Sequence, residues 1–221
     1  MKEKQAFAFF DFDGTMIPGD SIAAFVRYAR KRGIMPRREF FGALLAAARY
    51  VLGLTSAADS KSAALRFRMR LSPADREALD RAFVHDCLLP RLYPRAKACL
   101  DFHRQAGRTP VIVTASTDNY MRMVADALGV SALLATPLRP DGTVGENCRG
   151  EEKPRRIKAW LAEQGLEADF ATSFAYGDSK SDLPMLLLCG HPVQVNPKKA
   201  LRKAAPDMEA VRWSEKAERT L

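Results

Sequence analysis

An α/β fold with a helical insertion is predicted for this chain of 221 residues. A short apolar run near the N-terminus ends in an acidic, glycine-containing turn, which is typical of a buried strand. Four helical stretches follow, and only after residue 94 do strands and helices alternate. These observations predict a three-layer core around a central parallel sheet, interrupted after its first strand by an all-α bundle.

The insertion is predicted to cover residues 18–95, which leaves residues 1–17 and 96–221 for the core. Its helices are separated by Gly and Pro, and Asp20 and Ser72 stand at N-cap positions. Short loops between them favour antiparallel packing. The predicted helices of the insertion are Ser21–Arg32, Arg37–Leu52, Ser56–Arg70 and Pro73–Leu89.

The core is predicted from alternating apolar strands and amphipathic helices. A turn at Pro140–Gly142 indicates a hairpin, and the polar tail from Ala205 is expected to fray. The predicted core strands are Ala6–Phe10, Pro110–Val113, Ala132–Thr136, Ser173–Tyr176 and Val193–Val195. The predicted core helices are Arg95–Gln105, Asp118–Leu128, Pro154–Gln164 and Leu183–Leu188.

Positive charge is concentrated in the insertion. The chain holds 35 Lys and Arg against 26 Asp and Glu, and the segment 18–95 alone holds 15 against 7. Such a segment suits an anionic substrate or surface, although arginines also serve on solvated helix faces. A non-catalytic module that binds nucleic acid is the alternative of another class. No zinc spacing, aromatic interleaving or reader motif supports it, so no nucleic-acid partner is expected.

The chain has the features of a cytoplasmic protein. Its four cysteines form no C-x-x-C pair, which indicates reduced thiols rather than a disulfide or zinc framework. The N-terminal segment reaches acidic residues after four apolar ones, which does not fit a signal peptide. The longest apolar stretch, Phe40–Leu54, is too short to span a membrane.

The most specific motif is Asp11-Phe12-Asp13-Gly14-Thr15, at the end of the first predicted strand. In open parallel sheets, sites form outside the carboxyl ends of the strands. Two carboxylates at such a place suit a divalent cation, or a nucleophile with a neighbouring general acid. Gly14 permits a positive φ or a close approach of the backbone.

Three later segments carry weaker signals. Thr114 follows a strand and can bind a phosphoryl oxygen, and Lys153 opens a helix, where a cation can neutralise phosphate. Asp178 and Asp182 straddle a strand-to-helix loop and suit a metal site. Each segment alone also has an ordinary structural explanation, as a strand former, a solvated lysine or an acidic helix start.

The order of these segments resembles the four motifs of the haloacid dehalogenase-like phosphohydrolase superfamily, over residues 9–185. The helical insertion between the first two motifs looks like that superfamily's type-one cap. The stretches Gly150–Lys153 and Val195–Pro197 are similar to the phosphoserine phosphatase-like branch, subfamily IB. The resemblance implies a Rossmann-like core and a phosphoric monoester hydrolase.

The resemblance also implies roles for the acidic residues. Asp11 would be the nucleophile that forms an aspartyl-phosphate, and Asp13 would protonate the leaving oxygen and then activate water. Mg²⁺ would be held by Asp11, the main-chain carbonyl of Asp13 and Asp178, with Asp182 orienting a bound water. The presence of Asp13 favours phosphate transfer to or from oxygen.

Substrate contacts are implied in the same way. The side chains of Thr114 and Lys153 and the backbone N–H groups of Phe12 and Ala115 would hold the phosphoryl oxygens. Asp20 stands where phosphoserine phosphatases carry an acidic residue that binds the amino acid, and it is equally a helix N-cap. The expected substrate is a small phosphorylated metabolite.

The second cap helix suggests an alternative substrate. It is apolar around most of its circumference and is flanked by Arg37, Arg38 and Arg49, so it can also lie in a bilayer interface. That interpretation resembles the phosphatidylglycerophosphate phosphatases, with a lipid substrate. Burial within the cap or at a dimer contact is the preferred expectation. The candidates to meet a second anionic group of the substrate are Arg66, Arg68 and Arg70.

Overall fold

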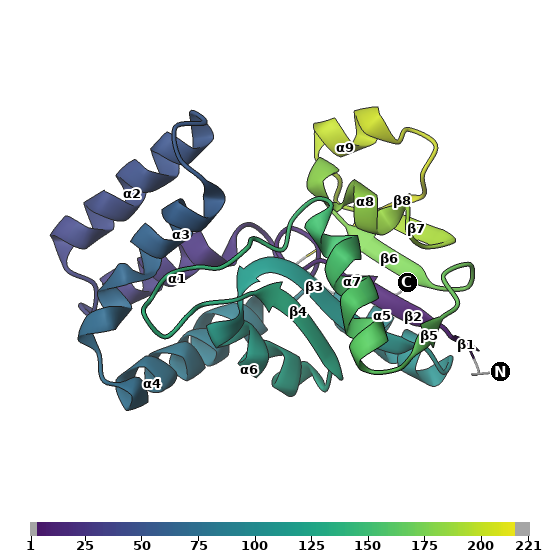
Figure 1. Cartoon of the computed structure of the whole chain (residues 1–221), viewed down its shortest axis with the longest axis horizontal. Coiled ribbons are helices and arrows are strands. Elements are labelled where there is room, and N and C mark those ends of the chain that lie inside the picture. Colours follow the sequence, from purple (N-terminus) through teal and green to yellow (C-terminus); the bar gives the residue numbers. More distant parts are fainter. Residues whose placement is uncertain (1–3, 215–221) are drawn as a thin grey trace.

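A six-stranded parallel sheet forms the centre of the molecule (Figure 1). The computed structural model describes residues 4–214. The strand order is β4-β3-β2-β6-β7-β8, and β1 (Lys4–Gln5) pairs separately with β5 (Glu167–Ala168). The strands of the large sheet are β2 (Phe7–Phe10), β3 (Thr109–Thr117), β4 (Ala132–Thr136), β6 (Phe174–Gly177), β7 (His191–Val195) and β8 (Ala210–Val211).

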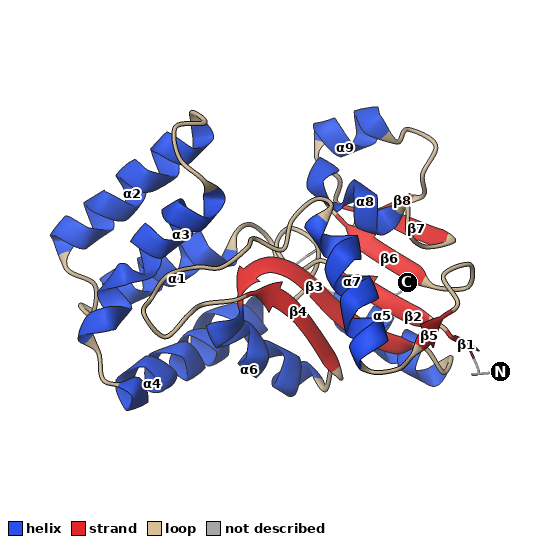
Figure 2. Cartoon of the chain, in the orientation of Figure 1, coloured by secondary structure: helices blue, strands red, loops and turns tan. Residues whose placement is uncertain are grey.

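Helices cover both faces of this sheet, which confirms the three-layer core (Figure 2). Alternate residues of β2 point to opposite faces: Phe7 and Phe9 join one hydrophobic cluster, and Ala8 and Phe10 join the other. α5 (Pro94–Gln105) and α6 (Asp118–Leu128) pack in the cluster of Phe10. The helices in the cluster of Phe7 are α7 (Glu152–Glu163), α8 (Leu183–Leu186) and α9 (Lys199–Ala204).

Four helices lie between β2 and α5 in the chain, as the sequence predicts. Asp20, Ser56 and Ser72 cap three of them through side-chain oxygens that accept backbone N–H bonds. The third and fourth predicted helices are shorter than expected, because each ends in a 3₁₀ or π turn. The elements are α1 (Ser21–Lys31), α2 (Arg37–Val51), α3 (Ala57–Leu65), η1 (Arg66–Arg70), α4 (Pro73–Phe83), η2 (Val84–Leu88) and η3 (Leu89–Arg91).

An aromatic cluster joins these helices to the core. The ring of Tyr120 on α6 lies 5.6 Å from that of Phe25 on α1 and 5.3 Å from that of Phe83 on α4. Because the three side chains belong to one hydrophobic cluster, the helical insertion is packed onto the sheet domain rather than tethered to it.

Two expectations about buried surface are wrong. Burial of the second cap helix within the cap is not observed, because Ala43 is the only residue of α2 that the structure describes as buried; a dimer contact, the other half of that expectation, stays a prediction. The polar tail does not fray as far as residue 214: β8 extends the sheet, and Trp213 is buried. Residues 215–221 of that tail lie outside the described part.

At Pro140–Gly142 the predicted hairpin is reduced to a turn with one bridge, between Leu138 and Val144.

Among residues 4–214, no helix combines the length and the apolar character needed to cross a bilayer.

Candidate active site

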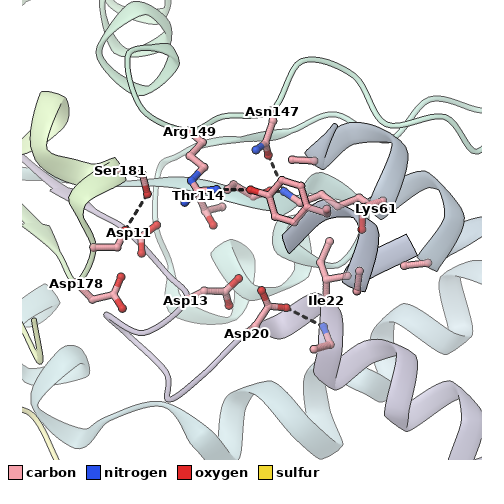
Figure 3. Close-up of a pocket in the computed structure, with 18 of the residues that line it drawn as sticks. Asp11, Asp13, Asp20, Ile22, Lys61, Thr114, Asn147, Arg149, Asp178 and Ser181 are labelled. Carbon is pink, nitrogen blue, oxygen red and sulfur yellow. Dashed lines mark hydrogen bonds between the residues drawn. The ribbon is translucent and has the colours of Figure 1, made fainter. Parts of the chain in front are cut away.

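The site lies at the carboxyl edge of three neighbouring strands. β2 is the middle strand and pairs with β3 on one side and β6 on the other. Asp11 follows β2, Asp178 follows β6, and Thr114 lies within β3 near its end. Their arrangement follows from the parallel sheet, because all three strands end at the same edge. Figure 3 shows these residues on one side of a cavity whose other side is formed by helices of the insertion.

A buried lysine links two of the acidic residues. The Lys153 ammonium donates to Asp11 Oδ1 at 2.6 Å and to Asp182 Oδ1 at 2.7 Å. Burial alone would lower the pKa of Lys153, but the two carboxylates outweigh it and raise that pKa. Lys153 is therefore a fixed positive charge. It lies in the first turn of α7, within the segment that the sequence singles out as a helix start.

The acidic residues fit a divalent cation. Carboxylate oxygens of Asp11, Asp178 and Asp182 all lie within 4.8 Å of one another, and the three residues are buried. Burial, reinforced by the charge of Asp182, raises the pKa of Asp11 to about 8 although Lys153 opposes the rise. Three such carboxylates repel one another unless cations neutralise them, and oxygen ligands of this kind suit Mg²⁺.

Asp13 is held apart from that acidic cluster. Its carboxylate accepts bonds from the Ser116 hydroxyl at 2.5 Å and from the backbone N–H and hydroxyl of Ser21 at 2.9 and 3.0 Å. Burial and the charge of Asp20 raise the pKa of Asp13 to about 6, although these hydrogen bonds oppose the rise. Asp13 therefore changes protonation near neutral pH. Its side chain is not among the clustered carboxylates, so it differs in environment from Asp11 two residues before it.

The predicted phosphate-binding positions surround the same space. Thr114 is buried, and its hydroxyl accepts the Ser116 backbone N–H at 3.0 Å across an irregularity of β3. Thr114, Ala115 and Lys153 line the cavity. Phe12 is fully buried and, unlike the other three, is not among the residues that line the cavity. The strand irregularity reorients the backbone after Thr114, which sequence patterning alone does not reveal.

The cavity extends from the acidic cluster into the insertion. It encloses about 710 Å³ between the sheet edge and helices α1, α2 and α3. Asp20 lines it and also caps α1, since its Oδ1 accepts the Ala23 N–H at 2.8 Å. Ile22, Phe40 and Leu44 give the far wall an apolar character. A substrate in this space would contact the charged side chains of the acidic cluster at one end and apolar side chains of the insertion at the other.

Several residues at the site were not found from the sequence. Lys61 on α3 donates to the Ala115 carbonyl at 2.5 Å and to Asn147 Oδ1 at 2.6 Å, and burial lowers the pKa of Lys61 to about 8. Arg149 lines the cavity and donates to the Tyr50 hydroxyl of α2. Lys198 donates to Asp178 at 2.8 Å. Among these residues, only Lys198 has a signal in the sequence, because it directly follows Asn196-Pro197, a stretch similar to the phosphoserine phosphatase-like branch. The contacts of Lys61 and Arg149 depend on how the cap helices pack over the sheet.

The three cap arginines do not reach this cavity. Arg68 is buried in an ion pair with Asp80, and Arg70 pairs with Glu39. Arg66 is exposed. The expectation that they meet a second anionic group in the substrate site is therefore wrong, because none of them lines the cavity. Arg68 and Arg70 are held in ion pairs within the insertion, and Arg66 faces solvent, as expected for at least one of the three.

The comparisons with known proteins identify the class. A family model described as haloacid dehalogenase-like hydrolase matches residues 8–187. Relatives include a probable phosphatase of Mycobacterium tuberculosis, 30% identical over 90% of this chain and 71% of the relative. A phosphoserine phosphatase of the same organism is 30% identical, over 90% and 68% of the two chains. A histidinol-phosphatase of Neisseria meningitidis is 27% identical, over 90% and 94%.

Solved structures agree in fold. A protein of unknown function from Bordetella pertussis superposes with a TM-score of 0.84 at 27% identity, over 95% of this chain and 99% of that one. A substrate-bound phosphoserine phosphatase superposes with a TM-score of 0.64 at 15% identity, over 95% and 94%.

The parallel sheet, its acidic carboxyl edge, the helical insertion and these relatives together define a phosphatase with a Rossmann-like core. The chain belongs to the haloacid dehalogenase-like hydrolase family. This membership confirms the resemblance inferred from the four motifs, and it makes a non-catalytic nucleic-acid module unnecessary as an explanation.

Proposed function

We propose that the chain is a Mg²⁺-dependent phosphomonoester hydrolase that acts through an aspartyl-phosphate on Asp11. The observation that carries the proposal is the buried set of Asp11, Lys153, Asp178 and Asp182 at the floor of the cavity. Residues 1–17 and 96–221 would form the catalytic core, and residues 18–95 would form a cap that encloses the substrate.

The proposed chemistry has two steps. The Asp11 carboxylate attacks phosphorus while the bond from phosphorus to the leaving oxygen breaks, and Asp13 gives its proton to that oxygen. Water then attacks the phosphorus atom of the aspartyl-phosphate while the bond from phosphorus to the Asp11 oxygen breaks, and Asp13 takes a proton from the water. This step releases inorganic phosphate and regenerates the Asp11 carboxylate. The pKa of about 6 for Asp13 suits both roles, because either protonation state is accessible near neutral pH.

The remaining residues neutralise and position the phosphoryl group. Mg²⁺ would be held by Asp11, Asp178, the Asp13 main-chain carbonyl and, through water, Asp182, and when bound it would offset the repulsion between carboxylate and phosphate. The proposed phosphoryl ligands are Thr114, Lys153 and the backbone N–H groups of Phe12 and Ala115.

A small phosphorylated metabolite is the proposed substrate class, as in the phosphoserine phosphatase-like branch. Phosphoserine and histidinol phosphate, named in two relatives, each carry an ammonium group beside the phosphorylated alcohol. The carboxylate of Asp20 lines the cavity and would bind such a group. A lipid phosphomonoester of the phosphatidylglycerophosphate type is the second candidate, which the apolar wall of Ile22, Phe40 and Leu44 favours.

The test is phosphate release, with Mg²⁺ and with EDTA, over a substrate panel. The panel contains phosphoserine, histidinol phosphate, sugar phosphates, nucleotides and phosphatidylglycerophosphate in detergent. We expect metal-dependent release from one class and none from the Asp11→Asn variant. The circular dichroism spectrum of that variant should match the wild type, which shows that the loss is not due to misfolding. Activity that persists in EDTA, or near-normal turnover by Asp11→Asn, contradicts the mechanism.

A further inference from the structure

The outer face of α2 is an exposed apolar stripe. Phe41, Leu45, Ala48 and Leu52 recur at spacings of four, three and four residues, which places them on one side of a helix. The exposed fractions of Phe41, Leu45 and Leu52 are 65%, 63% and 72%. In Figure 1, α2 is the outermost helix of the insertion. Exposed apolar surface gathered in this way marks an interaction site.

Positive charge borders one side of this stripe. Arg38 and Arg49 are exposed on the same helix, and Glu39 is the only acidic residue between residues 37 and 54. Glu39 is already paired with Arg70 of η1. A groove of about 520 Å³ runs between α2 and η1. It is lined by three arginines, Arg38, Arg66 and Arg70, and by two acidic residues, Glu39 and Asp141, so its charged lining is basic on balance.

The mouth of the catalytic cavity borders the other side. Phe40, Leu44 and Ala47 of α2 line that cavity, and their helix positions adjoin those of the outer stripe. The apolar surface of α2 is therefore continuous from the cavity mouth to the arginine-lined groove. α3 packs against one side of α2 and buries Ala43, but no described residue buries the outer stripe, and apolar helix surface of this kind is normally covered by protein or lipid.

We propose that α2 docks the cap onto the interface of an anionic lipid bilayer. With 15 residues, α2 is too short to cross the hydrocarbon core, so it would lie in the membrane plane with the stripe inserted. Arg38, Arg49 and the groove arginines would then face anionic lipid headgroups. Charge complementarity favours this occupant over a second copy of the chain, because two copies would bring the same arginines together.

Vesicle flotation tests the proposal. Vesicles of phosphatidylcholine alone are compared with vesicles that also contain phosphatidylglycerol, at low and high salt. We expect the protein to float with the anionic vesicles at low salt and to be released by high salt, because screening weakens the arginine contacts. Failure to float with anionic vesicles at low salt overturns the proposal.

Two pairs of variants separate the apolar and the charged contributions. Phe41→Ser with Leu45→Ser, and Arg38→Glu with Arg49→Glu, should each lower the bound fraction at least tenfold. The matched controls are Leu187→Ser and Lys158→Glu, exposed residues of the core, which should bind as the wild type does. Equal binding by the stripe variant and its control contradicts the assignment of the face.

Hydrolysis of a soluble substrate shows whether each variant is still folded. It also distinguishes failure of the membrane-binding proposal from failure of the proposed phosphatase activity. None of the four substituted residues lines the catalytic cavity, so hydrolysis of p-nitrophenyl phosphate should be unchanged in these variants. Asp11→Asn should lose hydrolysis but still float. A concentration-dependent dimer that Phe41→Ser with Leu45→Ser abolishes, without any flotation, would assign the face to a second copy instead.

Discussion

At the scale of single residues, the acidic cluster depends on a glycine beneath it. Gly14 has φ of +83°, and a Cβ atom at this position would lie 2.1 Å from Asp178 Oδ2. The turn after β2 and the position of the proposed metal ligand therefore require the same residue to lack a side chain.

The Gly14→Ala variant tests this dependence. The new methyl group should push Asp178 out of the cluster, so we expect kcat/KM for phosphate release and the affinity for Mg²⁺ both to fall at least tenfold. Steady-state kinetics and Mg²⁺ titration calorimetry measure the two quantities.

Gly33→Ala is the matched control for backbone strain. Gly33 has φ of +73°, but a Cβ atom there would meet nothing within 4 Å, so it shares the left-handed conformation without the collision. We expect the substitution to lower the free energy of unfolding by about 1 kcal/mol and to leave activity unchanged. If Gly14→Ala were as active as Gly33→Ala, the close approach to Asp178 would not matter for the site.

The sequence predicted the acidic side of the site but not its cap side. Asp11 and Asp178 follow strands whose apolar runs are visible in the sequence, so their meeting at one sheet edge could be inferred. Lys61 and Asn147 approach each other only because α3 packs over the sheet edge, and their local sequence carries no sign of it. The assignment of Arg68 to substrate binding was wrong for the same reason. Its ion-pair partner, Asp80, lies on another helix, and the local sequence does not show that the two meet.

At the scale of elements, periodicity and N-caps located the helices, but they did not show how each helix is covered. α2 looks like a core helix because its composition is apolar all round, a rule that assumes the same chain supplies the covering surface. In contrast, η1 is a short irregular turn, yet it holds a buried ion pair that ties the insertion together.

That ion pair gives a prediction about the packing of η1 against α4. Arg68 pairs with Asp80, which also accepts from Asn119 of α6 at 2.9 Å. Burial raises the pKa of Asp80, although Arg68 opposes the rise. Arg68→Met leaves that carboxylate buried without its cation, so it should cost about 3–5 kcal/mol of unfolding free energy in urea titrations.

Two further variants show whether the cost comes from the unpaired charge. Arg68→Met combined with Asp80→Leu should recover most of the lost stability, because no buried charge remains. Arg81→Met removes an ion pair whose side chains are 69% and 61% exposed, and should change stability by less than about 1 kcal/mol. A double variant no more stable than Arg68→Met would show that Arg68 acts through packing alone.

At the scale of the whole molecule, one buried histidine couples global stability to pH. His103 of α5 packs among Phe10, Phe174 and Tyr176 on the sheet, and its Nε2 lies 2.8 Å from the Tyr176 hydroxyl oxygen. Burial, and to a smaller extent the charge of Arg108, lowers the pKa of His103 from 6.5 to about 4. The folded protein therefore holds this imidazole neutral where the unfolded chain would protonate it.

The stabilisation from neutral His103 should be fully present above pH 6.5 and should be lost as the pH falls toward 4. Over that interval the unfolded chain binds the extra proton, so acid favours unfolding, by about 3 kcal/mol in total for a shift of this size. The carboxyls of Asp11 and Asp13, whose pKa values are raised, act in the opposite direction, since their folded forms bind protons more readily.

The contribution of His103 must therefore be measured as the difference in unfolding free energy between the wild type and a variant that lacks this histidine. Urea unfolding of the wild type and of His103→Gln, which keeps a hydrogen-bonding side chain but does not titrate, should give stability curves that converge as the pH falls from 6.5 to 4. Parallel curves over that range would show that His103 is not the group that makes this fold sensitive to acid.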